Sequence, residues 1–330
     1  MRITQSQLVE LARREVEHRA EGNGVVAAYL IGSIVHDRAL LGGAADVDLV
    51  IIHDSPPLDP REIVALSDDV HLDIAHHHRE QYAQPRRLRL DPWLGPAIYD
   101  PLLLHDPRHF FEWAQASARG QFLRADHRSS RARAFLERAR QTQATLDPER
   151  PWVSRYARAA VSGANAIATL AGQPAAGRRS LLLLEASSAE AECPEAHTGL
   201  LGLLGADACT SQDLAQWVSD WAKAYDAGCQ LTAEPALAPE RRAYYLKGFQ
   251  ALLESGQPHA ILLTLLDTWE PLLSTLDSFA DSESHRPAWE SAIASLGLAS
   301  PSAARRFAEL ESYLDHLEAF LEDWSNRHGA

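Results

Sequence analysis

Residues 25–52 constrain the fold of this 330-residue chain more than any other stretch, because they hold two apolar segments separated by a polar, glycine-bearing linker. The first segment has seven apolar residues and ends at Gly32-Ser33, which predicts a buried strand followed by a turn. The second segment begins with Asp46 and Asp48 and continues as an apolar run. It predicts a strand whose entrance carries two acidic residues.

Asp46 and Asp48 are two positions apart, so their side chains are expected on the same face of that strand. Adjacent carboxylates repel each other, and a divalent cation such as Mg²⁺, which prefers oxygen ligands, removes the repulsion. The alternating run of residues 71–75 predicts a neighbouring strand, on which Asp73 completes a cradle of three carboxylates for two metal ions. Such a pair of ions stabilises both the attacking and the leaving oxygen of an in-line phosphoryl displacement.

Gly32-Ser33 is expected to lie where the first strand turns into a helix. Glycine lets a phosphate group approach the backbone closely, and the Ser33 hydroxyl and the first N–H groups of the helix can donate hydrogen bonds to that phosphate. The sequence therefore predicts a phosphate-binding turn next to a metal-binding cluster of carboxylates.

The Gly32-Ser33 pair is followed, after a gap of twelve residues, by the motif Asp-Val-Asp-Leu that begins at Asp46. This arrangement resembles the signature of the DNA polymerase beta-like nucleotidyltransferases. The resemblance implies that Gly32 and Ser33 hold a nucleoside triphosphate and that Asp46 and Asp48 bind Mg²⁺. It also implies that Asp73 is a metal ligand and, in some members, the base.

The resemblance covers residues 25–107, under a third of the chain. Many family members carry a basic residue or a glycine shortly after the serine, and here Arg38 is the candidate for that phosphate-binding role. Arg178 and Arg179 follow a loop, as do basic pairs that face the cleft in some small-molecule nucleotidyltransferases. Their guanidinium groups can hold a triphosphate bidentately, the alternative being a solvated helix start. Glu185 is the candidate base for the acceptor, as a helical-domain acid is in aminoglycoside-modifying relatives.

An α/β (α+β) fold is expected for residues 1–110, the nucleotidyltransferase domain, in which helices flank a small mixed sheet. Helices are predicted at residues 3–20 and 60–67. The second prediction rests on Asp59, which can cap a helix, and on Pro60, which suits the first helical position.

A last strand is expected at residues 102–105, after which the sequence pattern changes. Residues 111–330 are predicted to form an all-α helical bundle domain. Apolar residues recur there at three- and four-residue spacing, most clearly in residues 152–170 and 307–324, and short breaks separate the helical patterns.

Three consecutive histidines, His76, His77 and His78, follow the predicted Asp73 strand. A histidine cluster is typical of some metal sites. The alternative, which we favour, is that these residues form a polar strand end near the mouth of the site.

The net charge of −14 argues against broad contact with nucleic acid, which depends on lysine and arginine, and is compatible with a cationic small substrate. The cysteines Cys193, Cys209 and Cys229 lack metal-like spacing and are expected to be thiols in a reducing cytoplasm. No apolar stretch approaches the ~20 residues that a membrane helix needs, and the N-terminus predicts a polar amphipathic helix, not a signal peptide. A cytoplasmic protein without membrane contact is expected.

The sequence thus predicts a Mg²⁺-dependent nucleotidyltransferase that moves a nucleoside monophosphate from a triphosphate, ATP being the first candidate, to a hydroxyl of a small acceptor and releases pyrophosphate. One alternative is nucleotidylation of a protein or tRNA, as in toxin–antitoxin pairs. Others are a non-catalytic nucleotide-binding protein and a nucleotide-sugar glycosyltransferase, the last disfavoured by the upstream Gly-Ser pair. The acceptor, the preferred base, the oligomeric state (a homodimer included) and the choice of general base between Asp73 and a helical-domain acid stay open.

Overall fold

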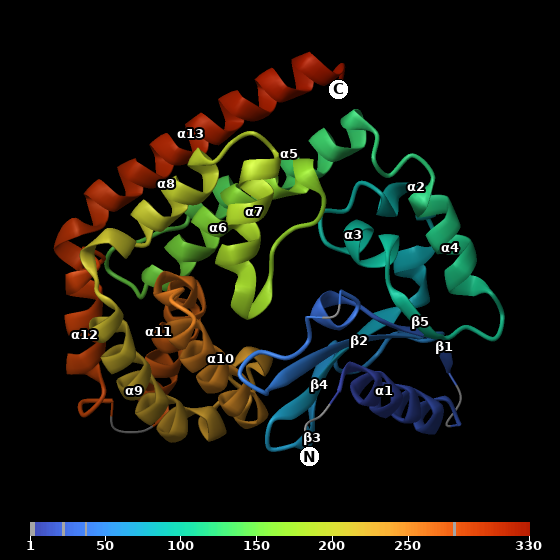
Figure 1. Cartoon of the computed structure of the whole chain (residues 1–330), viewed down its shortest axis with the longest axis horizontal. Coiled ribbons are helices and arrows are strands. Elements are labelled where there is room, and N and C mark those ends of the chain that lie inside the picture. The colour runs from blue at the N-terminus through green and yellow to red at the C-terminus, as the bar shows by residue number, and fades with distance from the viewer. Residues whose placement is uncertain (1–3, 22–23, 37, 280–281) are drawn as a thin grey trace. The chain divides into compact units, whose positions relative to one another are not determined.

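The computed structural model describes residues 4–21, 24–36, 38–279 and 282–330, and it has an α+β architecture with a small mixed sheet and many helices (Figure 1). The chain divides into two compact units. The first comprises Met1–Phe122 together with Glu240–Gly248, and the second comprises Leu123–Pro239 and Phe249–Ala330. The first unit therefore takes in a short segment from far along the chain.

The first unit is built on a five-stranded sheet with the strand order β3-β4-β2-β1-β5. Strands β2 and β4 run parallel to each other, whereas the other neighbouring pairs are antiparallel. The strands expected from the sequence around residues 25–31, 46–52, 71–75 and 102–105 are confirmed. The five strands are β1 (Val25–Leu30), β2 (Ala45–His53), β3 (Arg61–Ser67), β4 (Val70–His78) and β5 (Leu102–His105).

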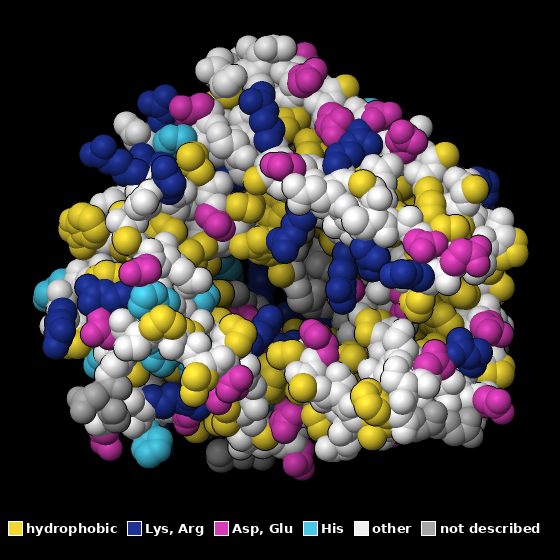
Figure 2. All heavy atoms as spheres, turned by 180° about the vertical axis from the view of Figure 1, so that it is seen from behind, with side chains coloured by type: hydrophobic (Ala, Val, Ile, Leu, Met, Phe, Trp, Pro, Cys, Tyr) yellow, Lys and Arg dark blue, Asp and Glu magenta, His cyan; other side chains and the backbone are white. Residues whose placement is uncertain are grey.

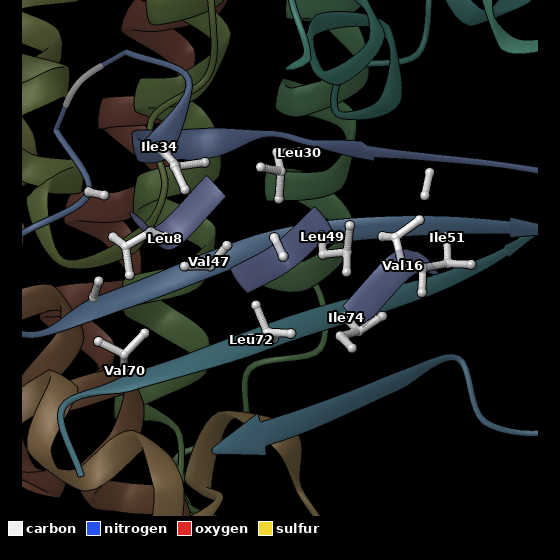
Figure 3. Close-up of a cluster of buried hydrophobic side chains, with 14 residues drawn as sticks. Leu8, Val16, Leu30, Ile34, Val47, Leu49, Ile51, Val70, Leu72 and Ile74 are labelled. Atoms are coloured by element: carbon white, nitrogen blue, oxygen red, sulfur yellow. The ribbon is translucent and has the colours of Figure 1, made fainter. Parts of the chain in front are cut away.

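One face of this sheet packs against helix α1 (Gln5–Ala20), which begins at a capping box formed by Thr4 and Gln7. Leu8, Ala12 and Val16 of α1 are buried against apolar side chains of β2 and β4 (Figure 3). This helix confirms the predicted helix at residues 3–20, of which residue 3 lies outside the described residues. Burial of this face fixes which way every side chain of β2 and β4 points.

The opposite face of the sheet is apolar only toward one end of β2. There Tyr29, Val50 and Ile52 form a second buried cluster with Phe111, whose ring stacks on that of Tyr29 at a centroid distance of 4.3 Å. Three helices contribute to this cluster: α2 (Pro85–Leu88), α3 (Leu94–Tyr99) and α4 (Phe110–Arg119). The remainder of this face carries acidic residues of β2 and β4.

The prediction of a helix at residues 60–67 is wrong, because this segment forms the edge strand β3. The capping pattern at Asp59-Pro60 suggested a helix, but Ile63 and Val64 are β-branched and favour a strand. A two-residue turn after Ser67 then returns the chain into β4, so the segment completes a hairpin. Pairing with β4 therefore outweighs the local helix-start signal.

The helix expected directly after Gly32-Ser33 is also shorter than predicted. The structure has a single 3₁₀ turn, η1 (Gly32–Ile34), which is followed by irregular backbone in the described residues up to β2. The turn is held against α1 by a hydrogen bond from the Gln5 side-chain amide to the Ile34 carbonyl. A phosphate at this bend would therefore meet one turn of N–H groups and not a long helix.

The second unit is helical throughout its regular secondary structure in the described residues, which confirms a C-terminal helical region. Its centre is α6, almost entirely buried, whose first N–H groups at Val153 and Ser154 donate to the buried carboxylate of Glu270 at 3.1 and 2.8 Å. Helix α9 (Ser211–Gly228) begins at a capping box formed by Thr210 and Asp213. The α-helices are α5 (Ala125–Gln143), α6 (Val153–Ala171), α7 (Ser180–Glu190), α8 (Glu195–Leu203), α9 (Ser211–Gly228), α10 (Arg242–Glu254, which begins in the segment of the first unit), α11 (Leu262–Phe279), α12 (Arg286–Ser295) and α13 (Ala303–His328).

No helix among the described residues combines the length and the apolar character that crossing a bilayer requires. On the face drawn in Figure 2, acidic and basic side chains are interspersed. The negative charge of the chain is therefore not gathered into one region of that face.

Candidate metal centre

Three carboxylates converge on the face of the sheet that α1 does not cover. Parallel pairing of β2 with β4 sets Asp48 directly beside Asp73, and Asp46 beside His71. One oxygen from each of Asp46, Asp48 and Asp73 lies within 4.8 Å of the others, and in the part of the chain that the structure describes no other group of three or more such ligands is found. Asp46 is 7% exposed, Asp73 is 3% exposed and Asp48 is half-buried, so the cluster is largely shielded from water.

The register that gathers these acids is set by the opposite face of the same strands. Val47 and Leu49 of β2 and Leu72 of β4 are buried in the cluster under α1. Because side chains alternate along a strand, burial of these residues turns Asp46 and Asp48 to the other face. A slip of one residue would bury the carboxylates in the core, which makes this alternative very unfavourable.

The Gly32 bend packs directly against one of the acids. The Ile31 N–H donates to the Asp48 carbonyl at 3.0 Å, and Gly32 has a φ of +73°. A Cβ atom at position 32 would lie 2.3 Å from Asp48 Oδ2, which is closer than atoms can approach. Ser33, half-buried, follows in the same turn. The structure thus brings the bend and the carboxylates together, and glycine is required at position 32 for both backbone conformation and space.

Two guanidinium groups contact Asp73. Arg61 lies on β3, diagonally across from Asp73 on the same face of the sheet, and donates through Nε to Oδ1 at 2.5 Å and through Nη2 to Oδ2. Arg241 comes from the segment 240–248, and its Nη2 contacts Asp73 Oδ2 and lies 3.5 Å from Asp46 Oδ2. These are charge-assisted contacts, which are among the stronger polar interactions in proteins.

Aromatic residues of the same segment surround the Arg241 guanidinium. Its Nη1 lies 3.4 Å from the Tyr245 hydroxyl, and its Cζ lies 6.0 Å from the centre of the Tyr244 ring. The His71 ring meets the Tyr244 ring edge-on, with centroids 5.3 Å apart, and His71 Nε2 lies 3.1 Å from Asp46 Oδ1. Arg241 is only 6% exposed, so its charge is balanced chiefly inside the site.

Burial, and after it the neighbouring Asp46 carboxylate, raise the pKa of Asp48 to about 7, although Arg241 and Arg61 act to lower it. The two guanidinium groups therefore do not fully offset the effects of burial and of the Asp46 charge on Asp48. A divalent cation among these oxygens would favour the ionised form of Asp48. The donor set consists of carboxylate oxygens alone, which fits a hard cation such as Mg²⁺ or Mn²⁺.

The other predicted site residues lie outside β2 and β4. Arg38 is exposed, and its N–H donates to the Ser33 carbonyl at 2.9 Å, so it follows closely on the bend. Arg178 and Arg179 form the 3₁₀ turn η3 (Gly177–Arg179), and Glu185 lies exposed on α7; all three belong to the second unit. Arg178 is 5% exposed, which differs from a solvated helix start. The functions assigned to these residues stay predictions.

The three histidine rings after Asp73 do not converge on one metal position, because they alternate between the two faces of β4. His76 Nδ1 lies 2.8 Å from His53 Nε2. His77 Nδ1 lies 2.7 Å from the Tyr82 hydroxyl, and burial together with the nearby His76 lowers the pKa of His77 to about 4. His78 Nε2 faces the carbonyl of residue 54 at 3.2 Å. Each ring has its own local partner, as expected for a polar strand end.

Sequence reasoning missed Arg61, His71, Arg241 and Tyr244. Alternation with Ile63 would have placed Arg61 on the acid face had the segment been recognised as a strand. Arg241 has no such local signal, because only the tertiary fold brings the segment 240–248 to the sheet.

No protein-family model matches this sequence, and no curated protein matches it. The interpretation of the site therefore rests on its geometry and chemistry.

Gly32→Ala should weaken Mn²⁺ binding about tenfold, a ΔΔG of about 1.4 kcal/mol, because the new Cβ displaces the Asp48 carboxylate. Gly43→Ala is the matched control, since Gly43 also has a positive φ, +81°, but has nothing within 4 Å of an added Cβ. Titration calorimetry with Mn²⁺ measures both. Equal affinities in the two variants would show that the bend does not position Asp48.

Without bound metal, the parent protein should lose stability as the pH rises, and Asp48→Asn should not show this loss. Because the pKa of Asp48 is about 7 in the folded state against an ordinary 3.8, the folded protein keeps a proton between these values that the unfolded chain releases. The contribution of this group to stability therefore falls as pH rises from about 4 to about 7 and is level above that. Denaturant unfolding with a chelator at pH 5 and pH 8 should show the variant gaining stability relative to the parent at the higher pH. A stability difference between Asp48→Asn and the parent that is equal at both pH values would contradict this prediction. The control Asp59→Asn, on an exposed loop, is expected to show such an equal difference.

Proposed function

We propose that the chain is a Mg²⁺-dependent nucleotidyltransferase of the DNA polymerase beta-like type, which transfers a nucleoside monophosphate from a triphosphate such as ATP to a hydroxyl group. The observation that carries this proposal is the convergence of Asp46, Asp48 and Asp73 next to the Gly32-Ser33 bend. A carboxylate cluster alone is compatible with many metal sites. A carboxylate cluster that packs against a bend able to take a phosphate group favours phosphoryl chemistry.

In this proposal Asp46, Asp48 and Asp73 hold two Mg²⁺ ions. When bound, these ions neutralise charge on the reacting phosphate and on the leaving pyrophosphate. Ser33 and the N–H groups of the short turn η1 hold the β- and γ-phosphates. Arg38, whose backbone N–H donates to the Ser33 carbonyl, adds a positive charge in this proposal. The acceptor hydroxyl attacks the α-phosphorus in line, the bond to the bridging oxygen breaks, and pyrophosphate leaves with that oxygen. Positioning and charge neutralisation supply most of the rate.

The proton of the acceptor hydroxyl needs a base, and the contacts of Asp73 bear on that role. Arg61 and Arg241 together engage both oxygens of this carboxylate. A carboxylate that already pairs with two guanidinium groups is less available to accept a proton. This favours Asp73 as a metal ligand and leaves the role of base to Asp73 in a rearranged site or to an acid of the helical unit such as Glu185.

The acceptor in this proposal is a small molecule, and the acidic net charge of the chain makes a cationic one the first to test. Nucleotidylation of a protein or tRNA, as in toxin–antitoxin pairs, is the second candidate for the same site. Incubation with ATP labelled at the α-phosphate distinguishes the two: label on an added aminoglycoside supports the first, and label on a macromolecule supports the second.

Asp48→Asn should abolish the release of pyrophosphate from ATP and acceptor, lowering the rate at least about a thousandfold, because it removes a charged ligand from the metal site. Circular dichroism and thermal unfolding should show that the substituted protein is folded, since asparagine has nearly the same shape. Asp59→Asn, on an exposed loop, is the control and should keep the parent rate. Pyrophosphate release by Asp48→Asn at the parent rate would refute the metal assignment.

Tight binding of ATP by the parent protein without turnover on any acceptor would instead indicate a non-catalytic nucleotide-binding protein.

A further inference from the structure

Arg241 occupies an unusual electrostatic position in the first unit. Its guanidinium bridges two of the three carboxylates, contacting Asp73 and lying 3.5 Å from Asp46, and it is almost completely buried. The carboxylate oxygens of Asp46 and Asp73 are also among those that would hold a cation. A guanidinium and a divalent cation are both attracted to these oxygens but repel each other, so each weakens the binding of the other.

The segment 240–248, which carries Arg241, makes further contacts within the first unit through Lys247. Lys247 pairs with Asp69 in the β3–β4 turn at 2.6 Å, and a Cβ on Gly42 would lie 2.3 Å from the Lys247 carbonyl oxygen. These contacts anchor the backbone near the carboxylates, so Arg241 stays close to the site even when its side chain changes rotamer.

Arg61 provides an internal comparison. It also contacts Asp73, but its side chain is 49% exposed, whereas that of Arg241 is 8% exposed. If a cation displaces it from Asp73, Arg61 can turn into water at little cost. Arg241, enclosed by Tyr244 and Tyr245, needs another anion within reach, because an unpaired buried charge is very unfavourable.

We infer that Arg241 couples cation binding to nucleotide binding: it competes with a lone divalent cation for Asp46 and Asp73, and it transfers to the phosphates when a nucleoside triphosphate arrives with the cation. This inference rests on the proposed function, because it requires a triphosphate beside the carboxylates. A guanidinium matches phosphate oxygens geometrically and can pair with them bidentately. The cation alone therefore binds weakly, and the cation with nucleotide binds strongly.

This coupling must be reciprocal. If the nucleotide raises the affinity for the cation by a given factor, the cation raises the affinity for the nucleotide by the same factor. The positive charge of Arg241 is thus balanced in both states, by carboxylates in the free protein and by phosphates in the complex.

The test is a set of Mn²⁺ titrations by calorimetry, with and without an ATP analogue that carries a methylene group in place of the α,β-bridging oxygen. For the parent protein the analogue should raise Mn²⁺ affinity about tenfold or more. Arg241→Gln should bind Mn²⁺ alone about tenfold more tightly than the parent, and the analogue should then change its Mn²⁺ affinity by less than about twofold. Arg61→Gln, which removes a charge from the same Asp73, should keep most of the coupling.

Mn²⁺ binding by Arg241→Gln that is no tighter than in the parent, or coupling equal to that of the parent, would overturn the inference. If circular dichroism shows that Arg241→Gln does not fold, Arg241→Lys serves instead. Lysine keeps the charge but cannot span two carboxylates, so the coupling between cation and analogue should be weaker in this variant than in the parent. If the analogue does not bind to any variant, the proposed function and the coupling both fail, while the titrations with Mn²⁺ alone still decide whether Arg241 competes with the cation. Loss of turnover in Asp48→Asn together with unchanged coupling in Arg241→Gln would overturn this inference alone.

Discussion

The parallel pairing of β2 with β4 is the interaction on which the rest of the site depends. It sets Asp48 beside Asp73 and Asp46 beside His71, and it is held in register by the apolar residues that the same strands bury under α1. The hydrophobic free energy of that face offsets the repulsion among the carboxylates on the other. The acids are therefore brought together by packing and not by their own interactions.

The charge balance of this site links its structure to its proposed chemistry. Three carboxylates face two guanidinium groups, and the pKa of Asp48 stays raised to about 7 despite both of them. Such a site favours additional positive charge, and a cation that arrives with a triphosphate brings its own balancing anion. The Gly32 bend, in contact with Asp48, gives that anion access to the backbone. Cation, phosphate and arginine form one electrostatic system in this account.

Much of this could be predicted from the sequence, and what could not has physical causes. The strands and the acid pair follow from apolar runs and from alternation, both of which are local signals. The sequence predicts a helix over residues 60–67 because the start signal at Asp59-Pro60 is local, whereas pairing with β4 is a tertiary effect. Arg241 could not be found at all, since its place beside Asp73 depends on how a distant segment folds back onto the sheet.

The most direct measurement of the central claim is a crystal structure of the protein grown with Mn²⁺ and the non-cleavable ATP analogue, with diffraction recorded at the manganese absorption edge. The account predicts an anomalous peak at about 2.1 Å from oxygens of Asp46, Asp48 and Asp73, with the phosphates toward Gly32. Manganese peaks at other positions only, with the analogue bound, would contradict it.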